Sequence, residues 1–215
     1  MVNIYTAEDE HFEDQAIRIK KLFYKYKARR VVIDANGLGI GLMDYMVKRQ
    51  VDAAGDVYPD FGVINDEEGF YKKFRTEDTE NDAIYAIKAN APINTEAYSI
   101  VQSQIESGKL RFLIDEKTAE NKLMGTKVGQ GMSPEQRGEY LMPYKLTTIL
   151  REEMLNLREE NEGINIILKQ ATKSIKKDKF SSLCYGMYYI KQEEESKRKK
   201  KRFNAKEWKL YSSSK

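Results

Sequence analysis

The sequence predicts an α/β fold, because signals for strands and helices alternate along its first fifty residues. The apolar run VVI (31–33) ends on Asp34 and is followed at once by the turn-forming ANG (35–37), which is typical of a buried strand. Apolar residues recur at helical spacing before and after it, over 12–26 and 38–50. The opening VNIYTA (2–7) is β-branched and aromatic and predicts a further strand. Strands that alternate with helices indicate an α/β sheet.

The rest of the chain predicts further strands and helices, one long loop and a charged end. Strands are expected over 58–64, 83–89, 110–114 and 164–170, and helices over 95–107, 143–160 and 179–195. The glycine-containing stretch 116–134 predicts a mobile loop. We therefore expect one folded unit over 1–195, followed by a basic, flexible C-terminal tail over 196–215.

Composition limits the class of protein. The chain has 215 residues, of which 40% are hydrophobic and 33% charged, so it is long enough for a sizeable core. Its longest apolar runs fall far short of the ~18 residues of a membrane span, and its first residues lack the pattern of a signal peptide. A single cysteine and a single histidine exclude a disulfide framework, a cysteine-based zinc site and sites with several imidazoles. We expect a soluble intracellular protein that makes no contact with membranes.

The net charge of +3 hides an asymmetry between the two parts of the chain. Residues 191–215 carry a net charge of +6, whereas residues 1–190 hold 27 basic and 30 acidic side chains. A mildly acidic body does not hold nucleic acid by bulk charge. A polyanion would therefore have to meet a local basic patch, a bound metal or the basic tail.

The segment VVIDANGLGIG (31–41) is the clearest candidate for chemistry. Asp34 ends an apolar strand, and in open α/β sheets the carboxyl ends of strands form the ligand crevice. Three interpretations are open: Asp34 binds a divalent cation, for which carboxylate oxygen is a preferred ligand; it caps the following helix; or the glycines form a dinucleotide-binding turn. The glycine spacing G-x-G-x-G does not match the dinucleotide fingerprint, and a carboxylate there would repel a pyrophosphate.

A second acid, Asp178, stands among Lys176, Lys177 and Lys179 where an apolar helix begins. It is either an acid of the first helical turn, where negative charge is favoured, or a second metal ligand with lysines beside it to meet phosphates. A two-metal phosphodiester site needs several carboxylates that hold two cations about 3.5 to 4 Å apart. Cys184, on the apolar face of the same helix, is expected in the core.

Four stretches resemble the nuclease part of the large terminase subunit of tailed bacteriophages and prophages. They are VVIDANGLGIGLMDYMV (31–47), YPDFGVINDEEGFY (58–71), MSPEQRGEYLMPYKLT (132–147) and KKDKFSSLCYGMYYIK (176–191). The resemblance implies a ribonuclease H-like fold and a metal-dependent endonuclease that cuts concatemeric viral DNA during genome packaging. It implies that two Mg²⁺ or Mn²⁺ ions are held by an acidic cluster to which Asp34 and Asp178 contribute as catalytic, metal-binding residues.

Lysines beside the second acid and in the glycine-containing stretch are expected to contact DNA, and the chain departs from the family at its first metal ligand. Lys176, Lys177 and Lys179 would place the DNA backbone, and Lys122 and Lys127 of the glycine-containing stretch are further candidates. The family's first metal-binding aspartate lies on a strand that precedes everything seen here, and a phosphate-binding loop of the ATP-driven half is absent. Residues 8–10, three acids in a row, are candidates to replace the missing ligand.

The implied partners are double-stranded DNA, the terminase ATPase domain, the small terminase subunit and the portal, in the cytoplasm of a bacterial host. The missing first aspartate favours an alternative of another class, a non-catalytic terminase fragment that binds DNA or the portal. A nucleotide-binding α/β protein is a third possibility, which saturable binding of a dinucleotide would support.

Overall fold

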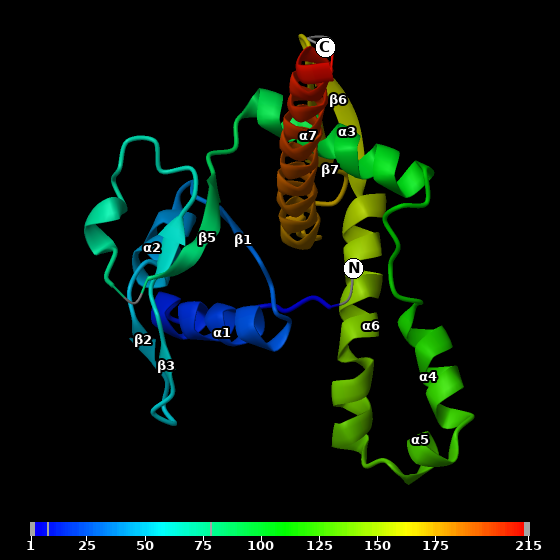
Figure 1. Ribbon diagram of the computed structural model, residues 1–215. Helices are drawn as coiled ribbons and strands as arrows, with labels where there is room; N and C mark the ends of the chain where they lie inside the picture. The colour runs from blue at the N-terminus through cyan, green and yellow to red at the C-terminus, as the bar shows by residue number, and fades with distance from the viewer. Residues whose placement is uncertain (1–2, 8, 78, 213–215) are drawn as a thin grey trace.

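The computed structural model describes residues 3–7, 9–77 and 79–212 (Figure 1). Its helices are α1 (Phe12–Lys25), α2 (Leu38–Met46), η1 (Lys72–Phe74), α3 (Ala91–Glu106), α4 (Glu116–Met124), α5 (Lys127–Gly131), α6 (Pro134–Leu155) and α7 (Asp178–Ser212). Its strands are β1 (Val31–Asp34), β2 (Gln50–Val51), β3 (Val57–Tyr58), β4 (Phe61–Val63), β5 (Glu80–Ile87), β6 (Leu157–Glu162) and β7 (Asn165–Gln170). The predicted α/β class is confirmed.

The central sheet has the strand order β1-β5-β4, and both pairs are parallel. Asp34 of β1 is in register with Ile87 of β5, and Val63 of β4 with Ile84. Because parallel strands point the same way, the carboxyl ends of all three strands meet at one edge of the sheet. This edge is where the sequence predicts a ligand crevice.

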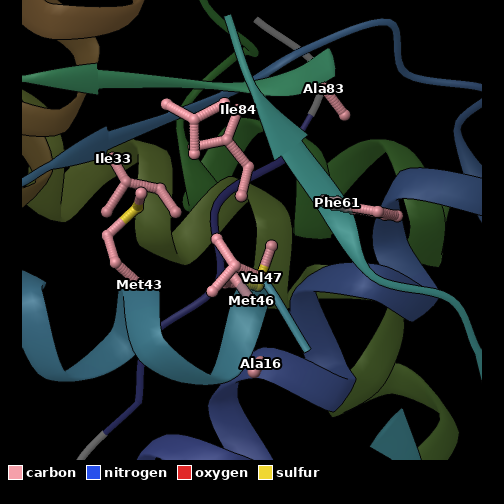
Figure 2. Packing of buried hydrophobic residues seen from close by; sticks show 9 residues of the cluster. Ala16, Ile33, Met43, Met46, Val47, Phe61, Ala83 and Ile84 are labelled. Carbon is pink, nitrogen blue, oxygen red and sulfur yellow. The ribbon is translucent and has the colours of Figure 1, made fainter. Parts of the chain in front are cut away.

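Helices α1 and α2 cover one face of this sheet. Their apolar side chains pack against inward-facing strand residues in one cluster, which is seen from close by in Figure 2 and comprises Ala16, Ile33, Met43, Met46, Val47, Phe61, Val63, Ala83 and Ile84. A charged residue lies at the border of this core: Lys20 of α1 is fully buried, and its Nζ donates to the carbonyl oxygens of Lys48 (2.6 Å) and Pro59 (2.8 Å). Burial lowers the pKa of Lys20 to about 8.

Helix α7 packs on the other face of the sheet. Neighbouring strand residues point to opposite faces, so Tyr85 points away from the cluster that contains Ile84 and towards α7. The ring of Tyr189 on α7 lies 4.9 Å from that of Tyr85 on β5, measured between centroids. A second cluster of buried residues joins α3, α6 and α7, and it comprises Ala97, Val101, Leu150, Phe180 and Cys184. Cys184 is therefore a core residue, as predicted, and burial raises the pKa of its thiol to about 12.

A buried carboxylate fixes the start of α7 against α6. Glu153 of α6 is 1% exposed. Its Oε1 accepts from Lys179 Nζ at 3.1 Å, and its Oε2 accepts from the backbone N–H of Phe180 at 3.0 Å. The first turn of α7 thus receives both a counter-charge and a hydrogen-bond acceptor from another helix.

Helices α4 and α5 and the first half of α6 form an arm that projects from the body (Figure 1). The sequence prediction of a mobile loop over 116–134 is wrong, because local caps stabilise short helices there. Asp115 accepts from Thr118 N–H at 2.9 Å, and Thr126 Oγ1 accepts from Gly129 N–H at 3.0 Å. Ser133 and Gln136 form a reciprocal capping box, so α6 begins at Pro134 and not near 143.

Other boundaries also differ from prediction. Helix α6 ends at Leu155, and the polar stretch 157–162 is strand β6, which pairs with β7 in an antiparallel hairpin. The described residues of the predicted strands 2–7 and 110–114 belong to no strand. Helix α7 continues beyond 195 to Ser212, so the backbone of most of the predicted tail is helical. Among the described residues, no helix is long and apolar enough to cross a membrane.

Candidate functional site

Asp34 lies at the carboxyl edge of the sheet and holds the turn that follows β1. Its Oδ1 accepts from Asn36 N–H at 3.1 Å, and Asn36 Nδ2 donates to Ala89 O, just beyond β5, at 3.0 Å. The N-cap of α2 is Gly37, and no side chain caps the helix. The interpretation of Asp34 as the helix cap is therefore wrong, because its hydrogen bond shapes the strand-to-helix turn. Two of the first amides of α2 donate to backbone oxygens instead, Gly39 N–H to Asn36 O at 3.0 Å and Ile40 N–H to Gly37 O at 3.2 Å.

The glycines of the same turn have steric functions. Gly37 has φ +52°, a conformation that other residues rarely adopt. A Cβ on Gly39 would lie 1.6 Å from Asp34 O, and a Cβ on Gly41 would lie 2.6 Å from the ring of Phe12. The glycines thus allow α2 to pack closely on β1 and α1. This accounts for the glycine pattern without a bound dinucleotide.

Tyr185 of α7 lies within the electrostatic influence of Asp34. The hydroxyl of Tyr185 donates to Asn94 Oδ1 at 3.2 Å. Burial, with the charge of Asp34 as a second cause, raises the pKa of Tyr185 to about 12. The sequence patterns that predict Asp34 and α7 give no sign of this electrostatic interaction, because it exists only once the helix packs on the sheet.

Asp178 is the exposed first residue of α7, seven residues before Tyr185. A rise of about 1.5 Å per residue places it about 10 Å along the helix axis from Tyr185. It lines a hollow of about 440 Å³ together with Lys176, Ser182, Leu150 and the segment 3–7. Asp34 is not among the described residues that line this hollow.

Lys179 and Lys177, which are predicted to contact DNA, have partners within the protein. Lys179 is paired with the buried Glu153. Lys177 Nζ donates to Leu168 O at 3.2 Å and so ties the start of α7 to β7. Lys176 lines the same hollow as Asp178. Lys122 on α4 and Lys127 on α5 are exposed on the arm. DNA contact by these five lysines stays a prediction.

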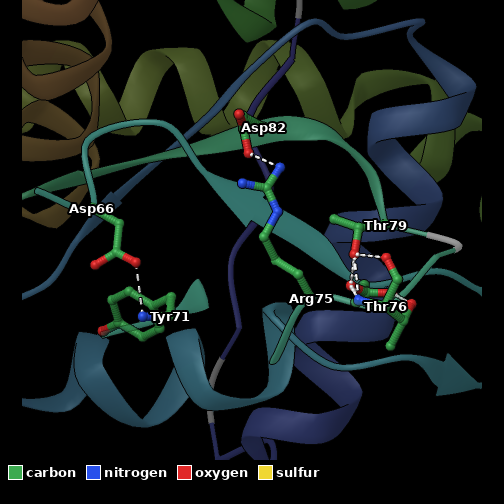
Figure 3. Close-up of polar contacts among 7 residues, drawn as sticks. Asp66, Tyr71, Arg75, Thr76, Thr79 and Asp82 are labelled. Atoms are coloured by element: carbon green, nitrogen blue, oxygen red, sulfur yellow. Dashed lines mark hydrogen bonds and ion pairs between the residues drawn. The ribbon is translucent and has the colours of Figure 1, made fainter. Parts of the chain in front are cut away.

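A hollow of about 500 Å³ lies at the carboxyl edge, between the ends of β4 and β5. Its lining residues include Asn65, Asp66, Tyr71, Tyr85, Lys88 and Ile93. Asn65 fixes one wall, because its side chain both donates to Ala86 O (2.7 Å) and accepts from Ala86 N–H (2.9 Å). Asp66 Oδ2 accepts from Tyr71 N–H at 2.8 Å (Figure 3).

Polar contacts also order the acidic segment that borders this hollow (Figure 3). The buried Asp60 accepts from the hydroxyls of Thr76 (2.8 Å) and Thr79. Burial alone would raise the pKa of Asp60, but these hydrogen bonds outweigh it and hold the pKa below its usual range. Arg75 pairs with Asp82 at 2.6 Å. These contacts give residues 66–77 a defined structure.

Within the part of the chain that the structure describes, no three His, Cys, Asp or Glu side chains come together as a metal site. Of the acids at 8–10 that could replace a missing ligand, Glu8 lies outside the described residues, Asp9 is exposed, and Glu10 pairs with Arg18. Asp34 lies at the carboxyl edge, and Asp178 is the first residue of α7. Each could bind an ion that is held by one or two carboxylates and several waters, as Mg²⁺ usually is. They do not form a closed two-ion cage.

Comparison of the chain with family models, with curated proteins and with solved structures finds no match.

Proposed function

We propose that the chain is a DNA-cutting, metal-dependent nuclease of the terminase type, with a ribonuclease H-like arrangement of sheet and helices. One observation carries the proposal. Asp34 ends a strand at the carboxyl edge of a parallel sheet, and α7, which begins with Asp178, packs on a face of that sheet. The two acids that the resemblance singles out therefore lie on elements that pack together, which supports the proposal.

The chemistry assigns distinct tasks to the residues present. Bound Mg²⁺ or Mn²⁺ would supply a water of lowered pKa and neutralise charge on the phosphodiester. Asp34 and Asp178 would each hold an ion through carboxylate oxygen, and Asn36 would keep the Asp34 carboxylate in place. Lys176, beside Asp178, would meet a phosphate of the DNA backbone.

Manganese binding tests the two ligands directly. We expect Asp34→Asn and Asp178→Asn each to weaken Mn²⁺ binding about tenfold, because an amide keeps the shape of the side chain but loses the charge that attracts the cation. The loss of the free Mn²⁺ signal in electron paramagnetic resonance measures binding. Asp14→Asn, which neutralises an exposed acid on α1, is the matched control and should bind like the parent chain. Unchanged Mn²⁺ binding in both site variants would contradict the assignment.

A non-catalytic module that binds DNA or the portal is the second candidate. Two observations favour it: the described residues contain no group of three metal ligands, and α7 continues through the basic run SKRKKKR (196–202). Such a module would bind DNA with an affinity that falls steeply as salt rises, and it would not cut DNA in the presence of Mn²⁺.

A further inference from the structure

The outer edge of β1 carries backbone groups that face away from the sheet. Ala35 N–H donates to Ile87 O at 2.8 Å, so the backbones of Val31, Ile33 and Ala35 face β5. The backbone N–H and C=O groups of successive residues in a strand point to opposite sides. Those of Val32 and Asp34 therefore point away from β5. Among the described strands, β1 is the last on this side of the sheet. An edge of this kind is a template for another extended chain.

Two hollows that share Ser182, which together we call the α7 trough, lie along α7, and the first of them includes Val32 of β1. The first, about 420 Å³, is lined by Arg29, Arg30, Val32, Ser182, Gly186, Tyr189, Ile190 and Glu193. The second is the 440 Å³ hollow with Asp178 and the segment 3–7, and it also includes Ser182. Asp178, Ser182, Gly186 and Ile190 recur every four residues and so line the trough along one face of α7.

The small side chains of this face leave room for a backbone. A Cβ built on Gly186 has no neighbouring atom within 4 Å. Ile190, one turn further along the helix, is 46% exposed and offers apolar surface. An extended segment paired with β1 would lie over these residues and cover them, as parallel sheets in α/β proteins are normally covered.

Arg30 indicates which charge an extended segment paired with β1 would carry. Its Nη1 donates to Arg29 O at 2.7 Å, but its Nε is buried and has no hydrogen-bond partner among the described residues. A buried donor without an acceptor is costly, and a carboxylate is the acceptor that a guanidinium prefers. Arg29 pairs with Glu193 at 3.8 Å. The two arginines outnumber this one acid in the lining of the hollow and would favour a further acidic side chain at this end of the trough.

We propose that the α7 trough binds an extended β-strand of another polypeptide, which pairs with the outer edge of β1 and places an acidic side chain at Arg30. The strand bonds through its backbone to Val32 and Asp34 and packs alternate apolar side chains on Gly186 and Ile190. This goes beyond the proposed function, because it concerns binding of a protein strand and holds whether or not the chain cuts DNA.

The test uses a fluorescent nine-residue peptide of alternating Thr and Val with a central Glu. Fluorescence anisotropy with the full chain should show saturable binding. Methylating alternate backbone nitrogens of the peptide should weaken binding about tenfold, since two or three ladder hydrogen bonds are lost. Replacing the central Glu by Lys should weaken it by a similar factor. Absence of binding, or equal binding of the methylated peptide, would overturn the proposal.

Two glycine variants show where the peptide binds. Gly186→Leu fills the trough without a clash in the protein itself and should weaken binding at least about tenfold if several contacts are lost. Gly138→Leu is the matched control, because Gly138 also lies in a helix with open space at its Cβ, but on the arm. Equal binding by all three proteins would overturn the proposal. Light scattering should find a monomer; a dimer that Gly186→Leu dissociates would make a second copy the occupant and would also overturn it.

Discussion

Glu153→Ala should lower the free energy of unfolding by about 3 to 5 kcal/mol, the usual cost of breaking a buried charge pair from one side. The substitution leaves the ammonium of Lys179 and the N–H of Phe180 without their acceptor at the start of α7. It also removes a contact that joins α6 to α7, the helix on which the candidate site depends. Chemical denaturation followed by circular dichroism measures the change.

Two further variants separate the effect of the Glu153 charge from the general effect of removing an acid from α6. Glu153→Gln keeps an acceptor for Phe180 N–H and should lose less stability than Glu153→Ala. Glu152→Ala removes the exposed neighbouring acid of α6 and should stay within about 0.5 kcal/mol of the parent. If Glu153→Ala were no more destabilising than Glu152→Ala, the buried pair would not support α7.

Stability should rise with pH between 8 and 10 because of Lys20. Burial lowers the pKa of Lys20 from 10.5 to about 8 in the folded chain. Between these values the unfolded chain binds more protons than the folded chain, so raising the pH favours folding. From pH 7 to pH 9.5 this group alone contributes a gain of roughly 2 kcal/mol in the free energy of unfolding.

Lys20→Met isolates this contribution. Cys184, whose pKa is raised to about 12, and the buried tyrosines oppose the trend at high pH, but they are present in both proteins. The difference between the two proteins in the pH dependence of unfolding free energy therefore reports Lys20. Parallel pH profiles for parent and variant would show that Lys20 titrates normally.

The sequence is informative where local signals and tertiary structure agree. The apolar run VVI, the acid that ends it and the glycine turn locate β1 and Asp34, because a buried strand and its turn have strong local signatures. The start of α7 at Asp178 is likewise visible as an acid before an apolar periodic segment.

Prediction fails where polar segments acquire structure from distant contacts. Strand β6 (LREENE) has no apolar alternation; it is a strand because it pairs with β7 and because Asn156 bonds to Thr172 across the base of the hairpin. The function of Glu153 also depends on a partner 27 residues away. No local pattern identifies a helical glutamate as the counter-charge of another helix, and this limits prediction of the candidate site as well.

Nicking of supercoiled plasmid in the presence of Mn²⁺, by the parent chain and Asp34→Asn side by side, tests the proposed function most directly. The parent chain should convert supercoiled DNA to the open circle, and the variant should be slower by about 10² or more, as expected when a ligand of the metal that activates water is lost. Equal nicking by both proteins would contradict the assignment of Asp34. Absence of nicking by both would contradict catalysis by this chain and favour the non-catalytic module.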